Sequence, residues 1–289
     1  MIATREAGGA LRGGYHESRG TRLGQGVNEA GLLDPEAVER TLAAVADYAQ
    51  LCRGADRIFG IGTSALRDAS NADGFIASFS ELLGVRVDVL SGDEEAASSF
   101  EGAMCGMKAA GKAVPAAVTV VDVGGGSSEF ATRAAEGAEP RVASLQIGAV
   151  RLTERYLTHD PPGADEIARC RQAIRVALAE LPADVRPCGA IVAVGGTANT
   201  AARMLQLTDR SGDGGAVAEI PAADVTVLLK ATLAMPIRER RRLRGLPEQR
   251  ADIFPAGLMI LDETVRLADA ASLTATESDL LLGYIARHT

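Results

Sequence analysis

The amino-acid sequence predicts an α/β protein of two lobes, and three observations lead to this fold class. The chain has 289 residues, which exceeds the usual size of one compact domain. Segments with strand and helix patterns alternate along it, as is typical of a mostly parallel α/β sheet. A strongly apolar strand begins at Ala117, after a linker-like stretch that contains Pro115. We therefore expect a first lobe over residues 1–115, joined by a terminal helix over 277–289, and a second lobe over 116–276.

The composition limits the classes of partner that the protein is expected to bind. Hydrophobic residues make up 47% of the chain and charged residues 24%, as in globular proteins. The net charge of −8 argues against nucleic acid or an anionic membrane, because both polyanions favour a basic surface. No run approaches the roughly 20 apolar residues that cross a bilayer, and the N-terminus lacks the apolar core of a signal peptide. The four cysteines have neither disulfide-framework nor metal-site spacing, so we expect a cytoplasmic protein.

Local patterns place the elements. A helix begins after Asp34, where Asp caps the helix and Pro35 takes the first helical position. Periodicity then predicts, in the first lobe, a strand over 57–62, a helix over 72–83, a strand over 85–90 and a helix over 94–110. In the second lobe it predicts strands over 117–123 and 190–194, a β segment over 144–148, and helices over 165–181, 222–235 and 252–267.

The glycine-rich segment after the strand at 117–123 carries the strongest functional signal. Three glycines let backbone N–H groups converge on an anion, and the serines that follow add hydroxyl donors. Asp122 and Glu129 flank them and could hold Mg²⁺, which proteins bind through one or two carboxylates together with phosphate oxygens. A tight hairpin, in which glycines only turn the chain, is the alternative, but the flanking acids favour phosphate binding. The residues expected to bind substrate here are Gly124, Gly125, Gly126 and Ser127.

A second turn of this type follows the buried strand at 190–194. Gly195, Gly196 and Thr197 open a helix, and helix N-termini attract phosphate through unpaired N–H groups and the helix dipole. Taken alone, this turn is equally consistent with a structural role. Two such loops in one lobe predict a phosphate site between them.

The first lobe supplies hydroxyls, a cation and acids. Thr63 and Ser64 end a strand and precede Arg67, whose guanidinium can clamp phosphate oxygens; a helix cap with an exposed Arg67–Asp68 pair is the alternative. The segment 91–96 places three carboxylates at a helix start. Acids there complement the helix dipole, or one of them faces a cleft between the lobes and activates water.

In order along the chain, these segments resemble the exopolyphosphatase/guanosine pentaphosphate phosphohydrolase (Ppx/GppA) family of the actin-like ATPase superfamily. The resemblance implies two ribonuclease-H-like lobes around a cleft, Mg²⁺ dependence, and release of orthophosphate from polyphosphate or from guanosine pentaphosphate. By position, Glu95 matches the family's general base, and Arg67 matches its phosphate-binding arginine. Asp122 and Glu129 match the acids of its second phosphate loop, so we assign catalysis to Glu95, Arg67 and Glu129, and metal binding to Asp122 and Glu129. The matching segments are 21–27, 63–71, 91–96, 122–129, 144–151, 195–197 and 250–252 with Gly257.

One departure concerns the first lobe. Family members begin with a strand and an Asp-x-Gly-(Ser/Thr)-Asn loop, which residues 1–20 do not supply; residues 8–14 have the pattern of a hairpin turn. We expect a lobe that is short of phosphate donors and has an unpaired strand edge, with poor solubility and weak activity. An added upstream segment with that loop is expected to raise activity at least about tenfold.

Several alternatives stay open at this point. They are a guanosine pentaphosphate phosphatase, a non-catalytic phosphate- or nucleotide-binding member, and an actin-like ATPase or sugar kinase. The oligomeric state, including a homodimer, is not determined. The arginine-rich stretch 238–244 either guides a polyanion or is a solvated helix face.

Overall fold

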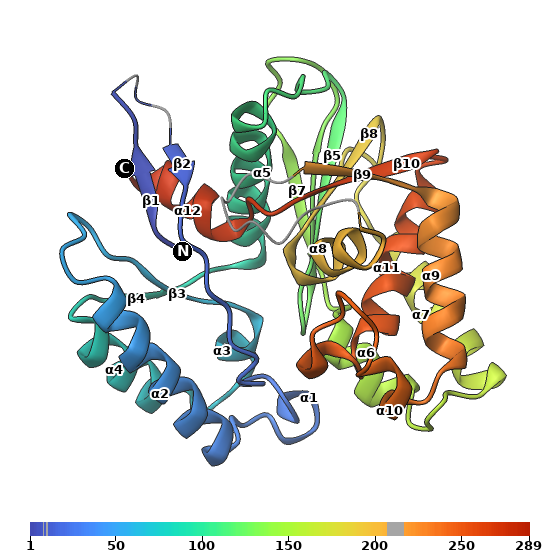
Figure 1. Cartoon of the computed structure of the whole chain (residues 1–289), viewed down its shortest axis with the longest axis horizontal. Helices are drawn as coiled ribbons and strands as arrows, with labels where there is room; N and C mark the ends of the chain where they lie inside the picture. Colours follow the sequence, from blue (N-terminus) through green and yellow to red (C-terminus); the bar gives the residue numbers. More distant parts are fainter. Residues whose placement is uncertain (8, 10, 207–216) are drawn as a thin grey trace.

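The computed structural model describes residues 1–7, 9, 11–206 and 217–289 (Figure 1). It has two bodies, and the smaller one is built from the N-terminal half of the chain. Its helices are α1 (Val27–Ala30), α2 (Pro35–Leu51), α3 (Ser64–Asp68) and α4 (Ala72–Leu83), and the next helix along the chain, α5 (Gly92–Ala109), packs on the sheet of the larger body. The strands of the smaller body form two pairs, an antiparallel hairpin of β1 (Ala3–Arg5) with β2 (Leu11–Gly13) and a parallel pair of β3 (Gly60–Gly62) with β4 (Val87–Val89).

The two strand pairs of the first body do not join into one sheet among the described residues. Residues of β1 and Ile61 of β3 instead line one cavity of about 640 Å³. The expected hairpin turn over residues 8–14 is shorter than predicted, because Leu11–Gly13 already form β2; residues 8 and 10 lie outside the described part. The expected unpaired strand edge of this body stays a prediction.

The larger body is built on a six-stranded mixed sheet with the order β7-β6-β5-β8-β10-β9. β5, β8 and β10 are parallel neighbours, whereas β6, β7 and β9 run antiparallel to the strands beside them. The strands are β5 (Val118–Val123), β6 (Ser128–Arg133), β7 (Arg141–Leu145), β8 (Ala190–Val194), β9 (Val217–Pro221) and β10 (Ser272–Thr276). The helices are α6 (Ala149–Tyr156), α7 (Ala164–Ala179), α8 (Gly195–Met204), α9 (Ala222–Ala234), α10 (Ile237–Arg240), the 3-10 turn η1 (Glu248–Arg250), α11 (Phe254–Leu267) and α12 (Leu280–His288).

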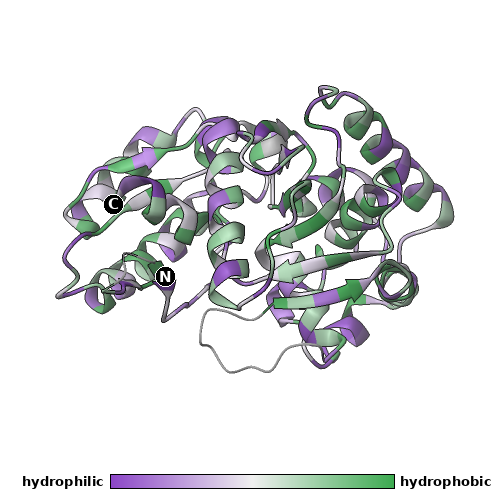
Figure 2. Ribbon diagram, turned by 90° about the horizontal axis from the view of Figure 1, so that it is seen from above, coloured by the Kyte–Doolittle hydropathy of each residue, from purple (hydrophilic) through white to green (hydrophobic). Residues whose placement is uncertain are grey.

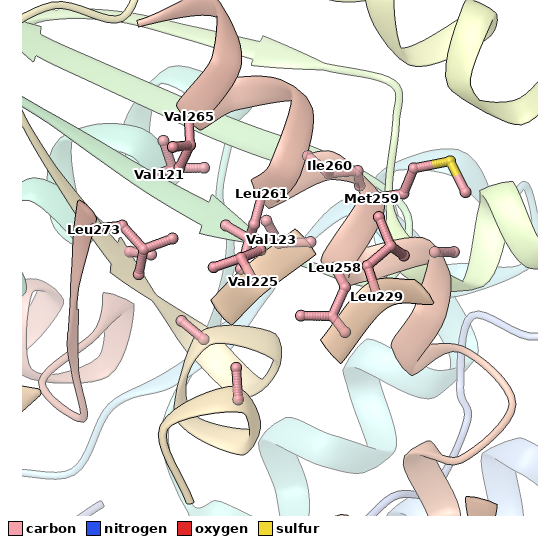
Figure 3. Packing of buried hydrophobic residues seen from close by; sticks show 14 of the residues in the cluster. Val121, Val123, Val225, Leu229, Leu258, Met259, Ile260, Leu261, Val265 and Leu273 are labelled. Carbon is pink, nitrogen blue, oxygen red and sulfur yellow. The ribbon is translucent and has the colours of Figure 1, made fainter. Parts of the chain in front are cut away.

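The main core lies between this sheet and α11. Every residue of α11 from Phe254 to Val265 is buried, so this helix is enclosed on all sides. Figure 3 shows Val121 and Val123 of β5, Leu229 of α9 and the apolar residues of α11 in one cluster. Figure 2 shows the same segregation, with hydrophobic residues concentrated in the strands of the sheet. A rigid sheet therefore positions the loops that follow β5 and β8.

Helix α5 packs on the other face of this sheet and is crossed closely by α12. Ala96, Phe100 and Ala103 of α5 cluster with apolar residues of β5 and β8. At the crossing, a Cβ added to Gly283 would overlap the carbonyl oxygen of Ser98. The end of α5 that bears the acidic segment is thus held between the sheet and α12.

The terminal helix α12 also contacts the first body. The Tyr284 hydroxyl donates to Asp88 at 2.6 Å, and Arg57 donates to the carbonyl oxygen of His288 at 2.7 Å. β3 begins only at Gly60 and not at residue 57, because its pairing with β4 starts at Gly60 opposite Val87, whereas Phe59 packs on Tyr284 of α12. The division of the chain at residue 115 stays a prediction.

Most predicted elements are confirmed, and the α/β class with them. The helix after Asp34 is α2, with the Asp34 side chain accepting from Ala37 N at 2.9 Å. The β segment expected over 144–148 is β7, which lies earlier, at Arg141–Leu145, because the chain turns at Gly148 into the unpredicted helix α6. The strands β6, β9 and β10 were not predicted either. β6 was interpreted as part of the glycine loop, and the apolar pattern of β10 is too short to be told from a helix start. No helix among the described residues is long and apolar enough to span a membrane.

Candidate active site between the two bodies

A cleft of about 470 Å³ is lined by residues from both bodies and collects the predicted site. It is smaller than the cavity lined by β1 and β3, but it is the one in which ionisable groups of the predicted motifs meet. The predicted residues that line it are Thr63, Ser64, Glu95, Asp122, Gly124, Gly125, Gly126, Ser127 and Glu129.

The glycine loop is the turn of the β5–β6 hairpin, and it also borders the cleft. Gly124 N donates to the carbonyl oxygen of Ser127 at 3.1 Å, and this bond closes the turn. The Gly125 carbonyl accepts from Val150 N at 2.9 Å, so the start of α6 is bound to the turn. A Cβ on Gly126 would overlap Ser64 Oγ of the first body. The hairpin alternative is thus correct for the backbone, while the glycines also allow the two bodies to approach.

The second serine of this loop does not serve the cleft. Ser128 is fully buried, and its hydroxyl donates to the carbonyl oxygen of Ile147 at 2.6 Å. The expectation that both serines present hydroxyls to an anion is therefore wrong for Ser128, because strand alternation turns it to the opposite side from Ser127. The hydroxyl of Ser127 acts at the site instead, where it hydrogen-bonds Glu129.

The three central carboxylates come from three elements, β5, β6 and α5. Asp122 and Glu129 face each other across the hairpin register, and Glu95 comes from the first turn of α5. Asp122 accepts from Ser99 Oγ at 2.7 Å, and Glu129 accepts from Ser144 Oγ at 2.8 Å. In the same acidic segment, Glu94 forms a capping box with Ser91. Glu94 thus has the capping role, and Glu95 lines the cleft, where the activation of water stays a prediction.

Burial raises the pKa of all three carboxyl groups. Burial raises the pKa of Glu95 to about 7, although the Arg67 guanidinium opposes the shift. Burial, and then repulsion by Glu95 and Asp122, raise the pKa of Glu129 to about 8. Burial raises the pKa of Asp122 to about 6, against a hydrogen bond from Ser99. A carboxyl group with a pKa near neutrality is suited to accept a proton in catalysis.

Arg67 is placed differently from the expected phosphate clamp. Its guanidinium donates to Glu95 and to the carbonyl oxygen of Leu90, and it is not among the described residues that line the cleft. It therefore positions Glu95 in this structure. Its predicted role as a phosphate ligand stays a prediction.

The second glycine loop lies next to two residues of the site, Asp122 and Arg250. A Cβ on Gly195 would contact Asp122, and a Cβ on Gly196 would overlap the guanidinium of Arg250. Thr197 is buried against Gly257 of α11. Among the described residues that line the cleft, none belongs to this loop. We find that it supports Asp122 and Arg250 from behind, and direct phosphate binding by it stays a prediction.

Three arginines that line the cleft were given no role from the sequence. Arg22 forms an ion pair with Asp252 at 2.8 Å, and Arg151 donates to the carbonyl oxygen of Gly126 at 2.6 Å. Arg250 lies over Gly196, where burial and then repulsion by Arg203 lower the pKa of its guanidinium. Arg22, Arg151 and Arg250 all lie in the segments on which the family resemblance rests, so that resemblance was the available signal.

The charge balance of the cleft favours a divalent cation. Six carboxylates and three arginines line it among the described residues, an excess of acid in a site expected to bind phosphate. No group of three or more His, Cys, Asp and Glu residues in the described part is arranged to hold a metal ion by itself. The two facing carboxylates of Asp122 and Glu129 fit Mg²⁺, which usually takes one or two carboxylates and completes its shell with phosphate oxygens and water.

We expect the free energy of unfolding of the metal-free protein to fall as the pH rises. An acid whose pKa is raised on folding stabilises the native state only while protonated, so the contribution of Glu129 is full below its ordinary value of 4.5 and is lost as the pH rises through about 8. Each unit of pKa shift corresponds to about 1.4 kcal/mol. Urea denaturation between pH 5 and pH 9 should show a steeper loss for the parent than for Glu129→Gln. Equal slopes would contradict the raised pKa.

Comparison with known proteins places these features in one family. Residues 2–283 match the model of the Ppx/GppA phosphatase family. A curated relative, "Exopolyphosphatase 2" of Mycobacterium tuberculosis, is 35% identical over 295 aligned residues, which cover 96% of this chain and 89% of the relative. A solved "exopolyphosphatase-like protein" is 30% identical with a TM-score of 0.83, over 93% of this chain and 87% of that one. The Ppx/GppA family member of Aquifex aeolicus is 27% identical with a TM-score of 0.74, over 93% of this chain and 86% of that one.

The fold and the comparisons define an actin-like α/β hydrolase, with the candidate site in a cleft between two lobes. The chain belongs to the Ppx/GppA phosphatase family, and it is a hydrolase of the exopolyphosphatase type.

Proposed function

We propose that this protein removes terminal orthophosphate from inorganic polyphosphate by attack of water, with Glu95 as general base and with Mg²⁺. The observation that carries the proposal is the placement of Glu95. It is a buried carboxyl group whose pKa is raised to about 7, and it borders the same cleft as the glycine turn. The relative named exopolyphosphatase 2 supports polyphosphate as the substrate.

Residues of both lobes take part in this mechanism. The terminal phosphate lies against the backbone of Gly124–Ser127, where N–H donors and Arg250 bind its oxygens. Glu95 accepts a proton from the attacking water, and Arg67 keeps the carboxylate in position for this transfer. Gly126 lies against Ser64, so the two lobes meet beside the glycine turn. Phosphoryl transfer depends mainly on such positioning and on charge stabilisation.

Asp122 and Glu129 would hold Mg²⁺ next to the substrate phosphates. When bound, the metal neutralises charge on the phosphate oxygens. The hydroxyls of Ser99 and Ser144 orient the two carboxylates from behind, as outer groups commonly do at metal sites.

We expect Asp122→Ala to weaken Mg²⁺ binding and hydrolysis together, each by at least about tenfold, because a carboxylate ligand is lost from a site with few protein ligands. Titration calorimetry with Mg²⁺ in the presence of phosphate measures the binding. Asp93→Ala is the matched control, since Asp93 is an exposed carboxylate at the start of α5. Unchanged Mg²⁺ and phosphate binding in Asp122→Ala would remove this residue from the site.

The choice of substrate is tested by comparing orthophosphate release from polyphosphate, guanosine pentaphosphate and ATP, each with Mg²⁺. The proposal requires the highest kcat/KM with polyphosphate. Preference for guanosine pentaphosphate would favour the alarmone phosphatase, and preference for ATP would favour an ATPase. Binding without turnover of any of them would identify a non-catalytic member. A cytoplasmic location and a homodimer remain expectations.

A further inference from the structure

We propose that four exposed arginines of the second lobe bind the distal phosphates of a long polyphosphate chain whose end lies in the cleft. This proposal rests on the proposed function. We call Arg238, Arg241, Arg242 and Arg244 the arginine patch. They lie in a seven-residue stretch, 238–244, that contains five arginines and one glutamate in a chain of net charge −8.

The fifth arginine of the stretch, Arg240, has a structural role. The Arg240 side chain is only 6% exposed and pairs with Asp160 at 2.9 Å, which ties α10 to the loop before α7. The patch arginines are exposed, and the side chain of Arg238 is 83% exposed. The sequence pattern therefore combines one buried structural arginine with four that face solvent.

Two of the patch arginines make only long ion pairs within the protein. Arg238 lies 3.9 Å from Glu239, and Arg241 lies 3.9 Å from Glu248, with both glutamates more than half exposed. Ion pairs of this length and exposure contribute about 0–1 kcal/mol, so phosphate oxygens can replace the carboxylates at little cost. Arginine also matches phosphate geometry through its planar fork of N–H donors.

The arginine patch lies next to the cleft. Glu248, the neighbour of Arg241, begins η1, and the next two residues of η1, Gln249 and Arg250, line the cleft. Arg22 of the first lobe donates to the carbonyl oxygen of Gln249 at 3.4 Å. Figure 1 shows α10 at the lower end of the second lobe. A polyanion that leaves the cleft past Arg250 thus meets Arg241 next.

The chemistry of the ligand follows from this arrangement. A chain of linked phosphates carries charge at every unit, so it can fill the cleft and the patch at once. Tripolyphosphate has too few units to need the patch. The acidic surface elsewhere disfavours nucleic acid, which needs a broad basic face.

The test removes the patch charges in one variant, R238Q/R241Q/R242Q/R244Q, and compares KM for long polyphosphate and for tripolyphosphate. Exposed arginines away from the cleft provide a control of equal charge, R86Q/R141Q/R169Q/R186Q. We expect the patch variant to raise KM for long polyphosphate about tenfold at low salt and to leave kcat/KM for tripolyphosphate within about twofold. The difference should shrink near 1 M salt, where the screening length is about 3 Å.

Three results would overturn the proposal. They are an equal change of KM in the control variant, an equal loss with tripolyphosphate, and patch-dependent binding of a single-stranded oligonucleotide that is as tight as that of polyphosphate. Equilibrium binding of long polyphosphate, measured by calorimetry, reports on the patch without turnover. If the parent releases no orthophosphate while the patch still contributes tenfold to binding, the proposed hydrolysis fails and the patch assignment stands.

Discussion

Replacing Glu95 by Gln is expected to lower kcat for orthophosphate release by about 10²- to 10⁴-fold, the usual cost of removing a general base. The amide keeps the shape of the side chain and can still contact Arg67, but it cannot accept the proton of water. Substrate binding, measured by calorimetry, should therefore stay within a few fold of the parent.

Glu94→Gln is the matched control for this substitution. Glu94 is the adjacent glutamate on α5, and it is exposed in a capping box in which Gln can also serve. It should change kcat by less than about twofold, since it makes no contact in the cleft that the mechanism uses. A loss below about fivefold in Glu95→Gln would show that Glu95 is not the base.

A large loss of stability is expected for Gly283→Ala. The added Cβ would overlap the carbonyl oxygen of Ser98 and approach the backbone of Gly102, so α12 would have to move away from α5. Overpacking commonly costs about 1–3 kcal/mol, and we expect the upper end because backbone atoms of a helix cannot rotate out of the way. Activity should fall as well, because α5 carries Glu95. Urea denaturation followed by circular dichroism measures the change.

Gly74→Ala provides the matched control. Gly74 lies in the exposed part of α4, and a Cβ there meets nothing within 4 Å. Alanine has the higher helix propensity, so this variant should be more stable than the parent by about 0.5–1 kcal/mol. A Gly283→Ala variant as stable as the parent would show that α5 and α12 are not packed as closely as the structure has them.

The sequence predicts those features of the site that are local. Asp122, the three glycines and Glu129 are adjacent along the chain, and the end of a buried strand brings them to one edge of the sheet. The N-terminal cap of α5 could also be predicted, because Ser91 and Glu94 have capping-box spacing. The site residue Glu95 follows them directly, but only the family resemblance distinguished it from Glu94.

Features that depend on contacts distant in sequence could not be predicted. Arg250 meets Gly196 only because η1 crosses the start of α8. Arg67 faces Glu95 only because β3 and β4 are paired, which brings the residues after each strand together. The glycines of α5 gave no signal of their own, since the role of Gly102 appears only when α12 lies against it.

The central claim is that water, activated in the cleft, attacks the terminal phosphate of polyphosphate. The most direct test follows the reaction of polyphosphate, Mg²⁺ and the full chain in ¹⁸O-labelled water by ³¹P NMR. We expect orthophosphate to appear as polyphosphate is shortened from its end, with one ¹⁸O atom from water in each orthophosphate released. Absence of orthophosphate, or orthophosphate without the label, would contradict it.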